Sequence, residues 1–127
     1  VSWRVDQPNQ SGTITPALTN LWESSRWLMW EKNPDTRMVT IVGRPLRRPD
    51  APIAGEYSRL YTLPSSLRPV QQQNTVAVSS RAGANKLVVF MVEVQTDGGV
   101  FLRNTDPDWL IGPNTSYHFS VSYRAAN

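Results

Sequence analysis

Hydrophobic positions in this chain come in short stretches that alternate with polar positions, and glycine, proline and asparagine separate the stretches. This pattern is typical of β-strands joined by turns, and it predicts about eight strands and no secure helix. Residues 26–31 and 37–42 flank the turn-forming segment 33–36, so they are expected to form a hairpin. The spacing of the strands predicts an all-β fold, specifically an antiparallel β-sandwich or jelly roll.

A stiff corner interrupts the strands in the middle of the chain. Pro64 lacks the N–H that a sheet ladder requires, and Pro69 follows after a short Ser-Ser-Leu-Arg turn. The residue before each proline is also held extended. We therefore expect the chain to leave one strand at this corner and to enter the next at residues 74–80, with Val76 and Val78 facing inward.

The segment 86–95 is apolar on both of its faces. One face carries Val88, Phe90, Val92 and Val94, and the other carries Leu87, Val89 and Met91. A strand that is apolar on both faces is covered on both faces. We expect Leu87, Val89 and Met91 to form an oligomer interface, and the alternative is that loop 44–54 of the same chain covers them.

The C-terminal third of the chain continues the strand pattern. Thr96-Asp97-Gly98-Gly99 predicts a tight hairpin, because glycine tolerates the positive φ of the favoured turns. The last strand alternates, and its expected inward residues are Phe119, Val121 and Tyr123, while its expected outward residues are His118, Ser120, Ser122 and Arg124.

Composition and charge narrow the class of protein. The chain has 127 residues and no cysteine, which fits one domain without disulfides or zinc thiolates. No apolar stretch is long enough to cross a bilayer, so membrane insertion is not expected. The net charge is +3 and most basic residues are spread along the sequence, so nucleic acid is not expected as a partner. A cluster at Arg44, Arg47 and Arg48 lies among prolines and predicts an exposed, stiff loop.

The sequence offers little for catalysis. The single histidine, His118, shares a strand face with Ser120, but positions two apart on a strand are separated by about 6.6–7 Å, beyond hydrogen-bond reach. Asp106 and Asp108 form the one close pair of carboxylates in a loop, and they lack the pattern of a calcium loop. We therefore expect no enzyme activity, no metal and no cofactor. The alternative is a small glycan-degrading or esterase domain that depends on His118 or Asp106.

Trp109 is the best candidate for ligand contact. It follows a polar, acidic loop, where an aromatic ring beside carboxylates can stack on a sugar and accept its hydroxyl groups. We predict a ligand site formed by Arg103, Asp106, Asp108 and Trp109. The alternative is that Trp109 packs beneath the last strand.

Several motifs together resemble a known family. The following motifs occur in this order: Trp27 and Trp30, the Met38–Gly43 strand, the Thr62-Leu63-Pro64 corner, Arg68-Pro69, the 96–99 hairpin and the serine- and aromatic-rich last strand. This arrangement resembles the C-terminal, receptor-binding head domain of bacteriophage tail fibres and related viral fibre proteins. The resemblance extends from about residue 22 to residue 124, and the longer, basic loop 44–54 departs from it.

The resemblance implies a β-sandwich head that forms a homotrimer at the tip of a viral fibre and binds a host-cell receptor, expected to be a glycan. Residues 26–127 would form the head, and residues 1–25 would be an N-terminal connection that includes the end of a fibre shaft. An adenovirus-type fibre head, a separate carbohydrate-binding module and a structural trimerisation cap remain alternatives.

Overall fold

The computed structural model describes residues 8–52, 57–80, 87–104, 111 and 115–127. These residues form eight strands and a short 3₁₀ helix, η1. The strands are β1 (Gln10–Ile14), β2 (Leu28–Lys32), β3 (Met38–Gly43), β4 (Tyr57–Thr62), β5 (Gln73–Ser80), β6 (Leu87–Val94), β7 (Gly99–Arg103) and β8 (Ser116–Arg124). The 3₁₀ helix, Ser65–Leu67, is the corner between the two prolines.

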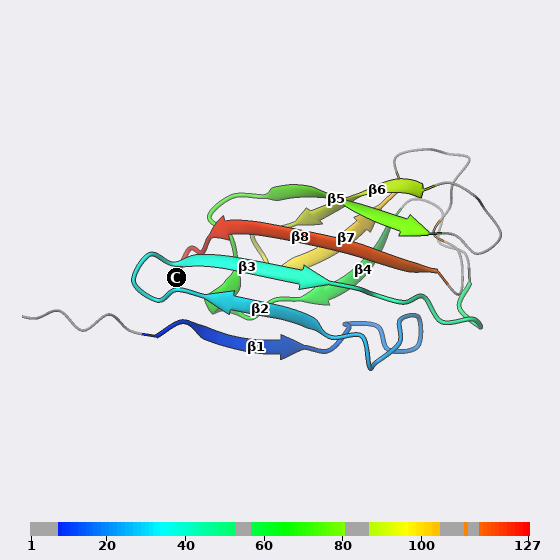
Figure 1. The fold of residues 1–127 in the computed structure, drawn as a ribbon, viewed down its shortest axis with the longest axis horizontal. Coiled ribbons are helices and arrows are strands. Elements are labelled where there is room, and N and C mark those ends of the chain that lie inside the picture. Colours follow the sequence, from blue (N-terminus) through cyan, green and yellow to red (C-terminus); the bar gives the residue numbers. More distant parts are fainter. Residues whose placement is uncertain (1–7, 53–56, 81–86, 105–110, 112–114) are drawn as a thin grey trace, which may run out of the picture.

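All eight strands belong to one sheet in the order β1-β2-β3-β8-β5-β6-β7-β4, and every neighbouring pair is antiparallel. The sheet curls on itself, so that β4 and β7 lie behind β3 and β8 in Figure 1. The predicted all-β, antiparallel fold is confirmed, and the two layers of the predicted sandwich are the two ends of a single curled sheet.

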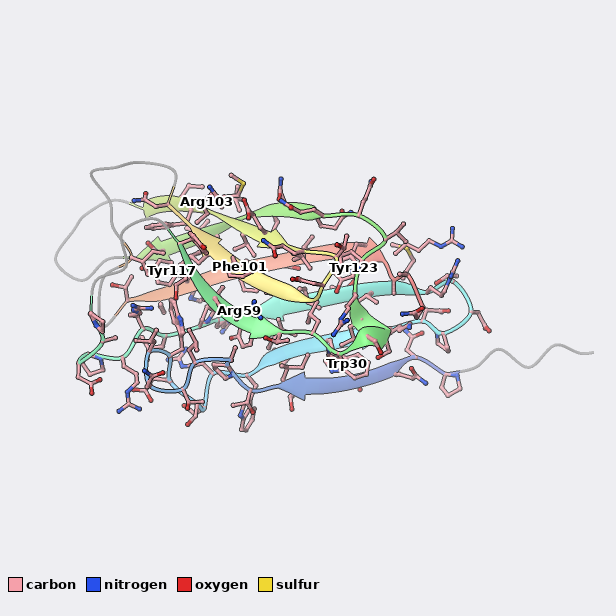
Figure 2. All side chains as sticks on the ribbon, turned by 180° about the vertical axis from the view of Figure 1, so that it is seen from behind. Trp30, Arg59, Phe101, Arg103, Tyr117 and Tyr123 are labelled. Atoms are coloured by element: carbon pink, nitrogen blue, oxygen red, sulfur yellow. The ribbon has the colours of Figure 1, made fainter. Side chains whose placement is uncertain are left out.

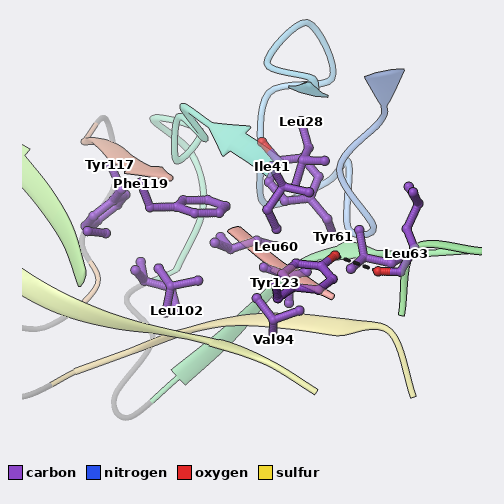
Figure 3. Close-up of a cluster of buried hydrophobic side chains, with 14 of the residues drawn as sticks. Leu28, Ile41, Leu60, Tyr61, Leu63, Val94, Leu102, Tyr117, Phe119 and Tyr123 are labelled. Carbon is purple, nitrogen blue, oxygen red and sulfur yellow. Dashed lines mark hydrogen bonds between the residues drawn. The ribbon is translucent and has the colours of Figure 1, made fainter. Parts of the chain in front are cut away.

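The core lies between the two layers. Leu28 and Ile41 point inward from β2 and β3, and Leu60 and Leu102 meet them from β4 and β7, all fully buried (Figure 3). Along these strands buried positions mostly alternate with exposed ones, so each strand contributes to the core with one face only. The predicted inward residues of β8 lie against this core, with Phe119 and Tyr123 buried and Val121 partly buried.

The N-terminal part of the described chain packs with the rest. Strand β1 pairs with β2, and the fully buried Trp22 joins the core. Trp22 donates a hydrogen bond from Nε1 to Ser58 Oγ on β4, 3.1 Å away. Residues 8–25 therefore contribute to the same folded unit. Residues 1–7 lie outside the described residues, and the role of residues 1–25 as a connection to a fibre shaft stays a prediction.

The orientation predicted for strand β5 was wrong. Ala77 is buried and Val76 is 58% exposed, so Val76 and Val78 lie on the outer face. The register explains the reversal: Ala77 pairs with Phe90, whose ring packs edge-on against Tyr117 at 5.1 Å. These two rings occupy the space beneath β5, and a small side chain fits above them where a valine would crowd them.

The expectation of an exposed basic loop at residues 44–54 was also wrong in part, because Pro45, Arg47 and Ala51 are buried. Arg47 is 1% exposed, and its guanidinium lies 5.0 Å from the centre of the Trp22 ring. Its two terminal nitrogens donate to Ser58 Oγ at 3.1 Å and to the Pro52 carbonyl at 2.7 Å. Stacking on an aromatic ring and hydrogen bonds to neutral acceptors hold this cation inside the fold.

The proline corner and the Asp-Gly hairpin meet in space. Leu63 N–H donates to the Gly98 carbonyl at 2.8 Å, which joins the two turns, and within the corner Arg68 Nε donates to the Leu63 carbonyl at 3.3 Å. Gly98 has φ of +93°, which confirms the positive-φ turn that the sequence predicted. The two stiffest turns of the chain thus fix each other.

Two buried tyrosines predict that the fold is sensitive to alkali. Tyr61 donates its hydroxyl to the Arg26 carbonyl at 2.8 Å, and Tyr123 donates to the Leu67 carbonyl at 2.5 Å. Burial raises the pKa of both hydroxyls above their usual value, although Arg26 slightly opposes this at Tyr61. The folded chain therefore keeps protons that the unfolded chain releases above about pH 10.

We expect the free energy of unfolding to fall by about 1.4 kcal/mol per pH unit for each tyrosine above pH 10. Urea unfolding at a series of pH values from neutral to alkaline measures this slope. Tyr123→Phe should reduce the slope, because phenylalanine has no hydroxyl proton that the unfolded chain could release. An unchanged slope in this variant would show that Tyr123 does not contribute to the alkaline loss.

Candidate binding surface

The outer face of β5 and β6 carries an apolar strip formed by Val76, Val78, Val89 and Met91. Val76 is opposite Met91 and Val78 is opposite Val89 in the antiparallel register. Val89 is 48% exposed, while Phe90, Val92 and Val94 on the other face are buried. The prediction of two apolar faces is thus confirmed for the described side chains. The described part of loop 44–54 leaves Val89 about half exposed. Residues 53–54 of that loop and the side chain of Leu87 lie outside the described residues, so coverage by the loop stays an alternative.

Beside this strip, β7 and β4 carry two aromatic rings and two arginines in alternation, which we call the arginine–aromatic square. Its members are Tyr57, Arg59, Phe101 and Arg103, of which Figure 2 labels the last three. Tyr57 pairs across the strands with Arg103, and Arg59 pairs with Phe101. Residues two apart on a strand share a face, so all four side chains lie on the outer surface, with each ring next to both arginines.

The four side chains of the square contact one another. The rings of Tyr57 and Phe101 lie 5.5 Å apart in an edge-to-face arrangement at 64°. The Arg59 guanidinium lies 4.9 Å from the centre of the Phe101 ring, and that of Arg103 lies 5.8 Å from the Tyr57 ring. These distances are typical of cation–π contacts, which hold each guanidinium in place at the surface.

Polar neighbours fix the arginines further. Arg103 Nε forms an ion pair with Glu93 Oε1 at 2.9 Å, and Arg59 Nη1 donates to Thr62 Oγ1 at 3.0 Å. Within the described part of the chain, no carboxylate pairs with Arg59. The square and Glu93 together therefore carry two positive charges and one negative charge. Counted over the described side chains, this surface is positively charged, with aromatic rings between the cations.

A shallow hollow lies on the opposite flank of the outer surface, over β1, β2 and β3. Its volume is about 210 Å³, and it is lined by Ser11, Met29, Trp30, Glu31, Thr40 and Val42. Asn9 Nδ2 donates to Glu31 Oε1 at 2.8 Å, and the hydroxyls of Thr40 and Ser122 share a hydrogen bond of 2.8 Å. The volume is below the range of about 300–1,000 Å³ that is usual for ligand pockets.

The predicted ligand site is described only in part. Arg103 lies on the outer face of β7, exposed and next to Met91 in the register of β6 and β7. Asp106, Asp108 and Trp109 lie outside the described residues, so their contact with Arg103 stays a prediction. The side chain of Leu87 is also outside the described set, while Val89 and Met91 lie on the outer face as predicted.

Three residues of the square were missed in the sequence. Tyr57, Arg59 and Phe101 lie on two strands far apart in sequence, and the signal was the repeated pattern of an aromatic residue followed two positions later by arginine. That pattern places each pair on one face of its strand. It does not show which strands are neighbours, and so the square could not be assembled from sequence.

Other kinds of site find little support. Among the described residues, no group of three or more acidic, histidine or cysteine side chains could hold a metal ion. Within the same residues, no helix is long and apolar enough to cross a membrane.

Comparison with known proteins then tested the resemblance. No protein-family model matches the chain, and no curated protein matches it. Among solved structures, the head domain of phage bIL170, reported in a study of the receptor-binding domains of lactococcal phages, superposes with a TM-score of 0.67. The match covers 93% of this chain and 99% of that one, at 12% sequence identity. The two chains share one fold. The resemblance to phage receptor-binding heads is confirmed at the level of the fold.

Proposed function

We propose that this chain is the receptor-binding head of a phage tail protein, which acts outside the host cell and attaches the particle to the host surface. The observation that carries this proposal is the match to nearly the whole of a phage head domain, from one end of the fold to the other. A match of this extent favours the phage alternative over an adenovirus-type fibre head. In this proposal the head lies at the tip of a tail fibre.

The proposal includes a homotrimer whose subunits meet through the apolar strip, with Leu87, Val89 and Met91 in the contact. Val76 and Val89 are about half exposed in the single chain and Val78 and Met91 are partly exposed, and the strip contains valine and methionine without lysine. Apolar residues and methionine are typical of the buried centres of protein interfaces, whereas lysine is depleted there. Burial between subunits would remove this apolar area from water.

The receptor in this proposal is a glycan, contacted by Arg103 and by the neighbouring Asp106, Asp108 and Trp109. The role is binding without catalysis. His118 is exposed on β8 together with Ser120 and Ser122, as on the polar outer face of an ordinary strand. A glycan-degrading activity would require His118 or Asp106, and unchanged turnover in His118→Ala and Asp106→Ala would exclude both residues.

A cell-binding experiment tests the proposed function. The fluorescently labelled chain is incubated with a panel of bacterial strains that includes lactococci, and bound fluorescence is measured by flow cytometry. We expect saturable binding to a subset of strains, which pre-treatment of the cells with periodate should abolish if the receptor is a glycan. Binding that survives periodate would contradict a glycan receptor, and equal binding to all strains or to none would contradict host attachment.

A further inference from the structure

We propose that the arginine–aromatic square binds an anionic sugar, meaning a saccharide unit with a carboxylate or a phosphate group. This inference rests on the proposed function, because it names the chemical class of the receptor. It also places the site on β4 and β7, with Tyr57, Arg59 and Phe101 as members in addition to Arg103.

The aromatic rings supply the apolar part of the site. Tyr57 is 54% exposed and Phe101 is partly exposed, and both lie on the flat outer surface of paired strands. A sugar ring has an apolar face formed by its C–H groups, and aromatic side chains bury such a surface while needing little ordering of their own. The edge-to-face contact at 5.5 Å keeps both rings in place before a ligand arrives.

The guanidinium groups supply the charge. Each arginine is already held by a ring and by one polar partner, Thr62 for Arg59 and Glu93 for Arg103. Each polar contact uses one N–H donor of its guanidinium, and a guanidinium has five donors in a fixed fork. The remaining donors match the paired oxygens of a carboxylate or phosphate, which guanidinium groups bind through two parallel hydrogen bonds.

The balance of charges sets the specificity. Among the described side chains, the two guanidinium groups and the carboxylate of Glu93 carry one net positive charge, which one anionic group would neutralise. A neutral sugar could contact the aromatic rings but would form no ion pair with the arginines. Glu93 also offers a carboxylate oxygen that can accept hydrogen bonds from sugar hydroxyls.

The position of the square agrees with the proposed trimer. Arg103 pairs in register with Met91 of the apolar strip, so the square adjoins the expected subunit contact without belonging to it. An interface has an apolar centre and a polar rim that water reaches. The square would lie at that rim and remain open to a polymer on the host surface.

Binding measurements with defined oligosaccharides test the inference. The probes are a neutral maltohexaose, a phosphorylated maltohexaose and a hexamer of galacturonate, measured by calorimetry at one ionic strength. We expect at least one acidic probe to bind about tenfold tighter than the neutral one, as charge-assisted hydrogen bonds to arginine predict. The phosphorylated and carboxylated probes show which anionic group is preferred.

A pair of variants with equal net charge locates the site. Arg59→Gln combined with Arg103→Gln should abolish the preference for the acidic probe. Arg44→Gln combined with Arg124→Gln removes two other exposed arginines and should keep it. Circular dichroism and thermal unfolding confirm that both variants fold. An equal loss in the two variants, or equal binding of acidic and neutral probes by the original chain, would overturn the inference.

The cell-binding experiment separates this inference from the proposed function. If the original chain binds cells and the Arg59→Gln, Arg103→Gln variant binds them equally well, the square is not the receptor site and host attachment still stands. If the original chain binds no cells while the acidic probe binds to the square, host attachment fails and the anion site stands.

Discussion

Val89→Glu is expected to convert the proposed homotrimer into monomers at micromolar concentration. Val89 is 48% exposed and lies opposite Val78, in the middle of the apolar strip. Its side chain would be buried between subunits, where the penalty for taking an ionised carboxylate out of water is about 3 kcal/mol or more per subunit. The strip offers no described cation directly opposite this position to compensate. Light scattering of the purified chain measures the change in molar mass.

A matched substitution controls for the added charge. Val70 is 63% exposed and lies outside the strip, in the segment after the proline corner, so Val70→Glu should leave the molar mass unchanged. Val89→Thr keeps the branched shape that strands favour and should weaken assembly less than Val89→Glu. A monomeric original chain would contradict the trimer directly, and a Val89→Glu chain that remained trimeric would move the interface away from the strip.

Gly98→Ala is expected to lower the free energy of unfolding by roughly 3 kcal/mol. The backbone of Gly98 has φ of +93°, a conformation that alanine adopts only with strain. A β-carbon at this position would also lie 2.5 Å from the Leu63 carbonyl oxygen, which is backbone and cannot rotate away. The turn would have to move, and the hydrogen bond from Leu63 N–H to the Gly98 carbonyl would weaken. Urea unfolding at neutral pH measures the loss.

Two further variants separate the causes. Thr96→Ala changes an exposed side chain of the same turn and should alter stability by less than about 0.5 kcal/mol. Gly98→Asn relieves part of the backbone strain, because asparagine tolerates positive φ, but it keeps the clash with Leu63. If Gly98→Asn were as stable as the original chain, the close approach of the two turns would not limit this position.

Strands β5 and β6 show why the pattern of a strand alone does not predict which of its faces is buried. Alternation along β6 separated two apolar faces, and the structure buries Phe90, Val92 and Val94 while Val89 stays exposed. Strand β5 was assigned the wrong face, because its valines looked like core residues and Ala77 did not. Which face of β5 is buried depends on the rings of Phe90 and Tyr117 beneath it, and these come from other strands.

The sequence by itself determined the local features that depend on the backbone and on nearby residues. Pro64 cannot donate to a sheet ladder and so ends its strand, glycine permits the 96–99 turn, and alternation along β8 separates Tyr123 from Ser122. These effects act over a few residues, so the strands, the corner and the fold class could be predicted.

Only the tertiary structure decided which strands are neighbours. The square exists because β4 pairs with β7, which starts more than thirty residues later in the chain, and the burial of Arg47 depends on a tryptophan from another segment. Pairing between distant strands is set by how the whole core packs, since many strands of similar pattern could pair equally well on local grounds. The physical reason is that a strand's pattern specifies a face to be buried but not the partner that buries it.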